Sequence, residues 1–489
     1  CVRLEGVRAL SALGGKRAAE LVLHAVDHPR DDALDYAVWL AARELEEAWV
    51  PAVLDGSFAD DGKLSRILFA VQAAETTAPI PLLVARLQAG SVSDADRPAL
   101  LDNVAKLGNP AHLRLAFDLA SDSKLPPEQA AALLEKMLEA HQFRKVQPTG
   151  ELSAVAELAA SPHKALAVAA IQAAAAWQVT SAVETLEKLA GSPDQSPARR
   201  RACITALGHL SGDAAHSALK ALAQRPELGE AIVGAACAAL VPRNAAEAAD
   251  LTIDWLATTP GESAQREVFT AFLSTKQGAD TLASALETGG RSLPAAVAKT
   301  GLQEVSSAGR EELALSRALE RFAAQAGVPL DGPHGMGPEE VAAFAELVMQ
   351  QGDAARGEAI YARESLRCVS CHRIDRKGGK VGPNLTAIGA SSPLDYIIES
   401  LIAPAKKVKE GYNTLLVVTE DGQVVTGIPV SRSLSELVLR DATDKEVRVA
   451  IADIAEEAPG TSLMPMGLID NLSREELADL VRYLAQLGR

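Results

Sequence analysis

The chain has 489 residues, of which 48% are hydrophobic and 23% are charged. This length and composition fit two domains with buried cores, and no apolar run is long enough to cross a membrane. The formal net charge is −16. Most of it falls in residues 1–351, and so acidic a region argues against nucleic acid as a partner.

Residues 1–326 form a long series of alanine-rich amphipathic segments separated by short breaks of Gly, Pro, Asp and Ser. The helical period is clear at the apolar positions Leu34, Val38, Ala41 and Leu45. Residues 7–24 are also similar to residues 204–221, with Gly15 aligned to Gly212. Paired helices that repeat along a chain stack as an α-solenoid, so we predict a domain that resembles HEAT repeats. A compact helical bundle is the alternative.

This helical region carries no recognisable catalytic arrangement, because its histidines and carboxylates are scattered without metal-ligand or nucleophile spacing. Cys203 and Cys237 each lie on an apolar stripe. Both are predicted to be core thiols, and a disulfide between them is the alternative. The tryptophans of this region are also predicted to be core residues: Trp39, Trp49, Trp177 and Trp255.

The chain begins at Cys1 without methionine, which we interpret as a fragment or a processed form. An N-terminal cysteine can also mark a lipid-anchored mature protein, but such proteins usually show a polar tether before the fold, so we do not favour this interpretation. Residues 327–351 are predicted to form a linker and a connecting helix, because Gly, Pro, His and Met interrupt the helical pattern between Gly327 and Pro338.

The segment Cys368-Val369-Ser370-Cys371-His372 has the spacing of a c-type haem attachment site. Two thiols three positions apart can each form a thioether with a haem vinyl group, and the adjacent histidine becomes the proximal iron ligand. Half of a structural zinc site is an alternative, but no second cysteine or histidine pair lies nearby to complete it. A thioredoxin-like redox pair is the other alternative, and the strand-to-helix setting that it needs is missing.

A haem that only carries electrons often takes methionine as its second axial ligand. Met464 and Met466 follow the motif, in a loop before the last predicted helix. Met464 is the ligand that we predict, and ordinary core packing is the alternative for either methionine. His334 and Met336 lie in the linker, and a flexible loop would hold a ligand poorly.

On the proximal side, the turn Gly382-Pro383-Asn384-Leu385 is expected to offer a backbone carbonyl to the outer N–H of His372. Such a contact fixes the imidazole tautomer and tunes the iron. Proline makes the turn rigid through its locked φ. Pro383 is therefore a predicted residue of the haem site.

His372 and Met464 are too far apart in sequence for a compact cytochrome domain without an insertion. Asp421-Gly422 lies between two runs rich in β-branched residues, which is typical of a tight hairpin. Two hairpins are predicted, formed by residues 414–419 with 423–427 and by residues 437–440 with 446–451. The insertion is expected at about residues 411–455.

These features resemble the haem-binding domain family described in planctomycete and verrucomicrobial multidomain proteins. The resemblance covers residues 352–489, and its motifs are Arg356-Gly357 before Tyr361, the haem motif, residues 382–389, Gly411-Tyr412, Asp421-Gly422 and residues 462–465. It implies covalent haem c at Cys368 and Cys371, with His372 and Met464 as axial iron ligands. Members of the family often follow a helical-repeat region, and many carry an upstream propeller domain that this sequence does not show.

The last helix is predicted to start at Ser473, which forms a capping box with Glu476. In cytochromes of this kind the terminal helix crosses the first one, which here carries Gly357 and Tyr361. Tyr483 is a candidate contact at the crossing, and a ring on the surface is the alternative. The predicted fold is mainly α: a HEAT-like α-solenoid followed, over residues 352–489, by a class I-like cytochrome c domain with a small β-hairpin insertion.

The predicted function is periplasmic electron transfer by one His/Met-ligated haem c, attached to a helical-repeat scaffold. The expected partner is a redox protein or an upstream dehydrogenase domain that donates electrons. Haem attachment to this motif takes place outside the cytoplasm, hence the periplasm. The alternatives are a haem enzyme or sensor with a displaceable sixth ligand, and a structural scaffold with an incidental haem domain.

A local basic patch follows the haem motif and consists of Lys406, Lys407 and Lys409. Such a patch would steer the docking of an acidic redox partner. A solvated surface cluster without a partner is the alternative.

Overall fold

The structure is a computed structural model that describes residues 2–288, 291–308, 312–325, 336–433, 435–465, 467–469 and 472–489. The chain divides into two compact units, Cys1–Ala218 and Leu219–Arg489. Cys1, His334 and Met466 lie outside the described residues, as does the predicted domain boundary between residues 326 and 327.

The described part of the first unit consists of helices and their connections. Its α-helices are α1 Val2–Leu13, α2 Lys16–Leu23, α3 Asp32–Glu44, α4 Glu46–Leu54, α5 Leu64–Ala74, α6 Ile80–Gln88, α7 Arg97–Leu107, α8 Pro110–Ser121, α9 Pro127–Arg144, α10 Ala154–Ala159, α11 Lys164–Ala176, α12 Val183–Gly191 and α13 Pro197–His209, with α14 Asp213–Ala223 at its end. Two short 3₁₀ helices are η1 His24–Asp27 and η2 Thr180–Ala182.

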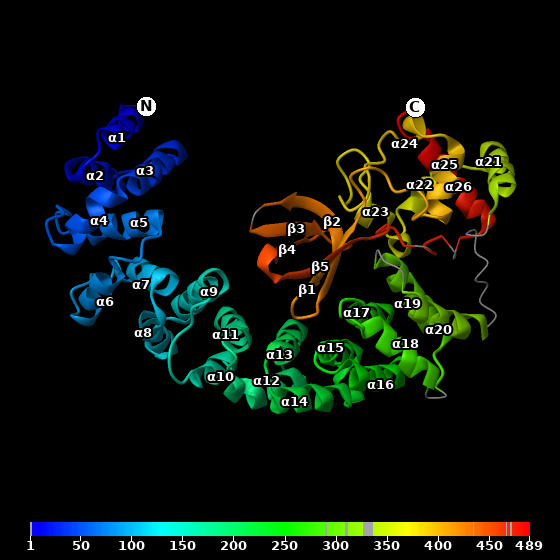
Figure 1. Ribbon diagram of the computed structural model, residues 1–489, viewed down its shortest axis with the longest axis horizontal. Coiled ribbons are helices and arrows are strands. Elements are labelled where there is room, and N and C mark those ends of the chain that lie inside the picture. The colour runs from blue at the N-terminus through cyan, green and yellow to red at the C-terminus, as the bar shows by residue number, and fades with distance from the viewer. Residues whose placement is uncertain are drawn as a thin grey trace. The chain divides into compact units, whose positions relative to one another are not determined.

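The helices of the first unit pack in two layers. Odd-numbered helices contact one another in succession from α1 to α13, while α2 packs on α4 and α10 on α12 in the other layer (Figure 1). Helix α3 shows the physical reason, because its predicted apolar stripe of Leu34, Val38, Ala41 and Leu45 is buried. A helix with one apolar stripe must bury it against neighbours, and stacking in layers does so.

The internal similarity found in the sequence appears at the turns between paired helices. Gly15 precedes α2 and Gly212 precedes α14, and both have a positive φ, of +84° and +92°. The same backbone hydrogen bond follows each glycine, because Ala19 and His216 donate their N–H groups to the carbonyls of Gly15 and Gly212. Glycine adopts a positive φ without the steric cost of a Cβ atom, so the residue recurs where the turn recurs.

Trp39 corrects the prediction that all four tryptophans are core residues. Trp49, Trp177 and Trp255 are buried, but Trp39 is 36% exposed. Trp39 follows the buried Val38 on α3 and so lies outside the apolar stripe. Its ring stacks on that of Tyr36 at a centroid distance of 5.8 Å instead.

The second unit contains helices and one sheet. Its α-helices are α15 Glu230–Leu240, α16 Ala245–Leu256, α17 Glu262–Leu273, α18 Gly278–Thr288, α19 Ala295–Ser307, α20 Leu313–Gln325, α21 Pro338–Gln351, α22 Ala354–Tyr361, α23 Cys368–Cys371, α24 Ile388–Ser391, α25 Leu394–Ile402 and α26 Arg474–Gln486. Its 3₁₀ helices are η3 Pro226–Leu228, η5 Glu364–Leu366 and η6 Ile451–Asp453. No helix in the described residues combines the length and apolar character that a membrane crossing needs.

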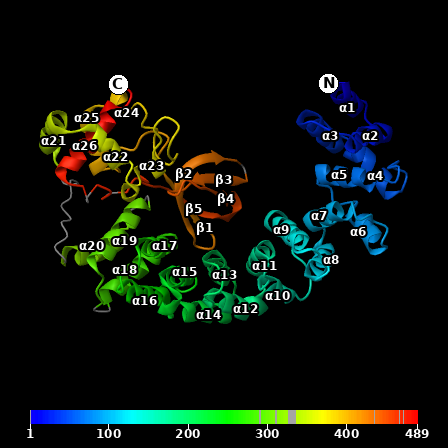
Figure 2. The same ribbon diagram turned by 180° about the vertical axis from the view of Figure 1, so that it is seen from behind.

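Helices α15 to α20 continue the two-layer pattern within the second unit. Helix α17 contacts both α15 and α19, and α18 contacts both α16 and α20 (Figure 2). The later helices do not extend this pattern. Instead, α21, α22, α25 and α26 pack around one separate core.

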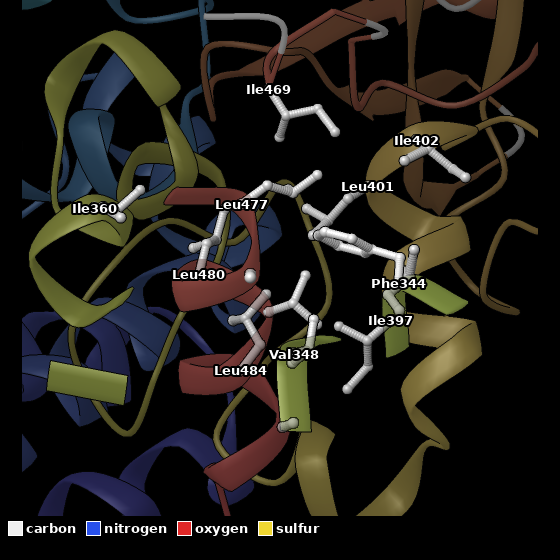
Figure 3. Close-up of a cluster of buried hydrophobic side chains, with 14 of the residues drawn as sticks. Phe344, Val348, Ile360, Ile397, Leu401, Ile402, Ile469, Leu477, Leu480 and Leu484 are labelled. Carbon is white, nitrogen blue, oxygen red and sulfur yellow. The ribbon is translucent and has the colours of Figure 1, made fainter. Parts of the chain in front are cut away.

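This core is formed by buried side chains of helices α21, α22, α25 and α26. Figure 3 shows side chains from α21, α22, α25 and α26 meeting there, among them Phe344, Ile360, Ile397 and Leu480. The predicted apolar positions of the last helix are buried: Leu477, Leu480, Val481 and Leu484. The capping box of Ser473 and Glu476 is present, as predicted.

Helix α22 crosses α26 at Gly357, in agreement with the predicted crossing. A Cβ atom at Gly357 would lie 2.6 Å from the carbonyl carbon of Asp479 and 2.7 Å from the Cβ of Tyr483. The rings of Tyr361 and Tyr483 lie 5.7 Å apart, centroid to centroid. Only glycine permits the two backbones to approach this closely.

The buried Asp479 was missed by the sequence reasoning and ties the same two helices together. Its carboxylate accepts hydrogen bonds from Nε and Nη2 of Arg356, at 2.6 and 2.9 Å, and from the N–H of Asp353 at 2.7 Å. The bonds from Arg356 hold the pKa of Asp479 below its usual value. Asp479 lies on the side of α26 away from its predicted apolar positions, so the helical pattern gave no signal for this contact.

The sheet is antiparallel and has the strand order β4-β3-β2-β1-β5. Its strands are β1 Leu415–Thr419, β2 Val424–Arg432, β3 Glu436–Arg440, β4 Glu446–Ala450 and β5 Ile454–Pro459. Both predicted hairpins are present, because β1 pairs with β2 and β3 with β4. Strand β5 was not predicted and extends the sheet to Pro459. It pairs with β1, a partner distant in sequence, and lacks the β-branched character that marks the other strands.

The β1–β2 turn is joined to the helical repeats of the same unit. The N–H of Lys276, in the loop between α17 and α18, donates to the carbonyl of Gly422 at 2.9 Å. The N–H of Val424 donates to the carbonyl of Ser274 at 2.8 Å. The Nζ of Lys276 also pairs with Glu456 at 2.8 Å. The end of the repeats and the sheet are therefore directly connected.

Candidate functional site

The two cysteines of the motif lie at the ends of the one-turn helix α23. Residues three apart on a helix lie on the same face, so the turn directs both thiols to one side. Both thiols are half-buried and neither is in a disulfide. Burial raises the pKa of the Cys368 thiol to about 11, so this thiol is protonated at neutral pH.

His372 follows α23 directly and turns away from the helix. Its backbone leaves the helical region at φ −109° and ψ 136°, while its N–H still donates to the carbonyl of Cys368 at 2.8 Å. Its Nδ1 lies 2.9 Å from the carbonyl oxygen of Pro383, which is the contact expected from the sequence. Because a carbonyl only accepts, Nδ1 carries the proton and Nε2 keeps its lone pair.

The environment of His372 favours the neutral imidazole. Burial lowers the pKa of His372, and the hydrogen bond to Pro383 only partly opposes that effect. A neutral imidazole is the form that binds metals. Gly382 keeps the space beside the ring open, because a Cβ atom there would lie 2.6 Å from Nδ1 and 2.8 Å from Nε2.

One cavity of about 450 Å³ brings the predicted residues together. Cys368, Cys371, His372, Pro383 and Met464 all line it. Met464 enters from the loop after β5, where its N–H donates to Oγ of Ser462 at 3.0 Å. Residues nearly 100 positions apart in the chain therefore form the walls of a single site.

The cavity also has walls that the sequence reasoning missed. They come from several elements and include Ser307, Tyr396, Ile397, Leu401, Ile428 and Leu468. Helix α25 provides three of these side chains, and its amphipathic pattern was the signal available in the sequence. The contributions of α19 and β2 depend on packing between distant segments and left no such signal.

The basic patch of Lys406, Lys407 and Lys409 lies beside the cavity. Lys407 and Lys409 are among its lining residues. Glu399 pairs with Lys406 at 2.8 Å and with Lys407 at 3.7 Å, so part of the positive charge is neutralised. All three lysine side chains are exposed.

The zinc alternative for Cys368 and Cys371 requires further histidine, cysteine or carboxylate ligands close by. Across the described ranges, no group of three or more such side chains is placed to hold a metal ion. Cys203 and Cys237 are buried and free of disulfides, as predicted, and burial raises the pKa of each thiol to about 12.

Comparison with known proteins identifies part of the helical region. Residues 152–241 match the HEAT repeats family, which covers the segment from the residues just before α10 to the end of α15. No curated protein matches the chain. The predicted solenoid of HEAT-like repeats is thus supported by both packing and sequence similarity.

Proposed function

We propose that residues 352–489 bind one covalent haem c and transfer electrons, with the HEAT-like repeats as scaffold. The observation that carries this proposal is the meeting of Cys368, Cys371, His372 and Met464 on one cavity. A pair of thiols, an imidazole and a thioether are the groups that attach and ligate haem in cytochromes c.

The residues that line the cavity fit a covalently attached haem c. The two thiols are free and lie on one helical turn, as attachment to two vinyl groups requires. The lining is largely apolar, with Val381, Ile388 and Leu401 among its members. An apolar surround excludes water and is one of the protein's means of tuning a haem potential.

Each side chain has a distinct role in the proposed site. Cys368 and Cys371 would form the thioethers, while Nε2 of His372 and the sulfur of Met464 would ligate iron. Pro383 holds Nδ1 of His372 and so presents Nε2 for ligation. When bound, haem would supply one-electron chemistry through the Fe(II)/Fe(III) couple.

We place the protein in the periplasm, because attachment of haem to this motif takes place outside the cytoplasm. A dehydrogenase domain or partner protein would donate the electrons. The exposed side chains of Lys407 and Lys409 beside the cavity offer a docking surface for an acidic redox protein.

Replacement of Met464 tests this proposal. We expect Met464→Ala to keep its covalent haem but to lose the weak long-wavelength band of methionine-ligated ferric haem, because the sixth ligand is gone. Visible spectra of the oxidised and reduced full chain, made with a cytochrome c maturation system, measure this change. Met349→Ala is the control, because Met349 is 52% exposed on α21 and does not line the cavity.

Two results would contradict His/Met electron transfer. A wild-type chain that binds no covalent haem would contradict the proposal that haem c is its cofactor. A haem that is high-spin and binds carbon monoxide equally well in the wild type and Met464→Ala would favour an enzyme or sensor with an open sixth position.

Gly382→Ala provides a second prediction, on the proximal side. The new Cβ atom would overlap the ring of His372, so we expect a displaced imidazole, weaker iron ligation and less low-spin haem per protein. Haem content and the visible spectrum check this. Gly337→Ala is the control, because a Cβ atom there meets only Oε2 of Glu340, at 3.9 Å. Spectra of Gly382→Ala that equal the wild type would show that the ring is not beside Gly382.

A further inference from the structure

Helix α19 of the repeats reaches the proposed haem cavity. Ser307, in its last turn, lines the cavity and is only 9% exposed. Glu304 lies three positions earlier, and residues three apart share one face of a helix. Glu304 therefore lies on the face of α19 that is directed toward the cavity.

Glu304 is a largely buried carboxylate between two arginines. Its side chain is 12% exposed and accepts a hydrogen bond from Nη1 of Arg266 on α17. The hydroxyl of Thr270 donates to its other oxygen at 3.3 Å. Nη1 of Arg367 lies 3.9 Å from Oε1 of Glu304, the same oxygen that accepts from Arg266.

Arg367 directly precedes Cys368 and also lines the cavity. Its backbone has a φ of +56°, an uncommon conformation for a residue with a side chain. Its carbonyl accepts hydrogen bonds from both the N–H and the hydroxyl of Ser370, at 3.2 and 2.7 Å. These two hydrogen bonds fix the backbone of Arg367. Its guanidinium faces the carboxylate of Glu304.

We propose that Glu304 is a positioning residue of the redox site: it holds the Arg367 guanidinium at the cavity, where this charge raises the reduction potential. This inference rests on the proposed function. Reduction lowers the charge of the site by one, so a nearby cation favours the reduced state. Arg367 is 32% exposed, and a partly buried charge is screened less than a free surface charge.

The test is a double-mutant cycle on the midpoint potential of the full chain, measured by spectroelectrochemical titration. We expect Arg367→Gln to lower the midpoint potential. Arg367→Lys keeps the positive charge, so its midpoint potential should stay close to that of the wild type. In the Glu304→Gln background, the lowering caused by Arg367→Gln should be roughly halved or smaller, because the guanidinium is no longer held in place. The cycle cancels the direct effect of removing the Glu304 charge.

Glu262→Gln is the matched background control. Glu262 pairs with Arg266 on α17, as Glu304 does, whereas the ion pair of Arg367 is with Glu304. The effect of Arg367→Gln should therefore be unchanged in Glu262→Gln. If Glu304→Gln fails to fold, Glu304→Asp keeps the charge, shortens the reach and permits the same comparison.

Haem content is measured first, so that the two proposals can fail separately. A wild-type chain without covalent haem would contradict the proposed function. With haem attached, an Arg367→Gln variant of unchanged potential would overturn the inference. So would a lowering of the same size in the wild-type and Glu304→Gln backgrounds.

Discussion

Replacement of Cys368 and Cys371 by alanine is expected to abolish covalent haem attachment completely. Each thiol supplies one thioether, and the chain has no other cysteine close to the cavity among the described residues. Haem staining of a denaturing gel measures the loss, because only covalently attached haem survives unfolding. Each single replacement should leave one thioether and a red-shifted reduced spectrum.

The control for this prediction is the pair Cys203→Ala and Cys237→Ala. Both thiols are buried in helical repeats and neither lines the cavity, so their removal should change packing but not attachment. Full haem staining in the Cys368/Cys371 double variant would refute attachment at the motif. Equal loss in the Cys203/Cys237 variant would show that attachment merely follows overall stability.

The Gly357→Ala variant should destabilise the crossing of α22 and α26. Its Cβ atom would overlap the carbonyl group of Asp479, and overpacking of this kind costs about 1–3 kcal/mol, or more where backbone must move. The effect should be local, so we expect faster amide hydrogen exchange in α22 and α26. Hydrogen exchange followed by mass spectrometry measures both helices separately.

Gly6→Ala is the matched control, since Gly6 also lies within a helix, and a Cβ atom there would meet no other atom within 4 Å. Alanine there should be neutral or stabilising by up to about 1 kcal/mol. Unchanged exchange in Gly357→Ala would mean that the two helices do not approach as closely as described. This crossing supports the core shown in Figure 3, and its loss would loosen one wall of the cavity.

Much of the local structure could be predicted from the sequence because it depends on neighbouring residues. The apolar period of α3, the capping box of α26 and the hairpin at Asp421-Gly422 each need only a few consecutive positions. The contact from His372 to Pro383 was also predictable, because a rigid turn follows the motif within a dozen residues. The haem itself remains a prediction, based on motif spacing and now on the cavity.

Only the tertiary structure decided which distant segments meet. Strand β5 exists because it pairs with β1, and Trp39 is exposed because its position on α3 lies beside the buried stripe. Ser307 lines the cavity and Glu304 lies beside Arg367 through the packing of α19, which no local pattern records. Composition and periodicity determine which residues favour burial and where helices begin, whereas contacts between remote segments depend on the shape of the packed surfaces.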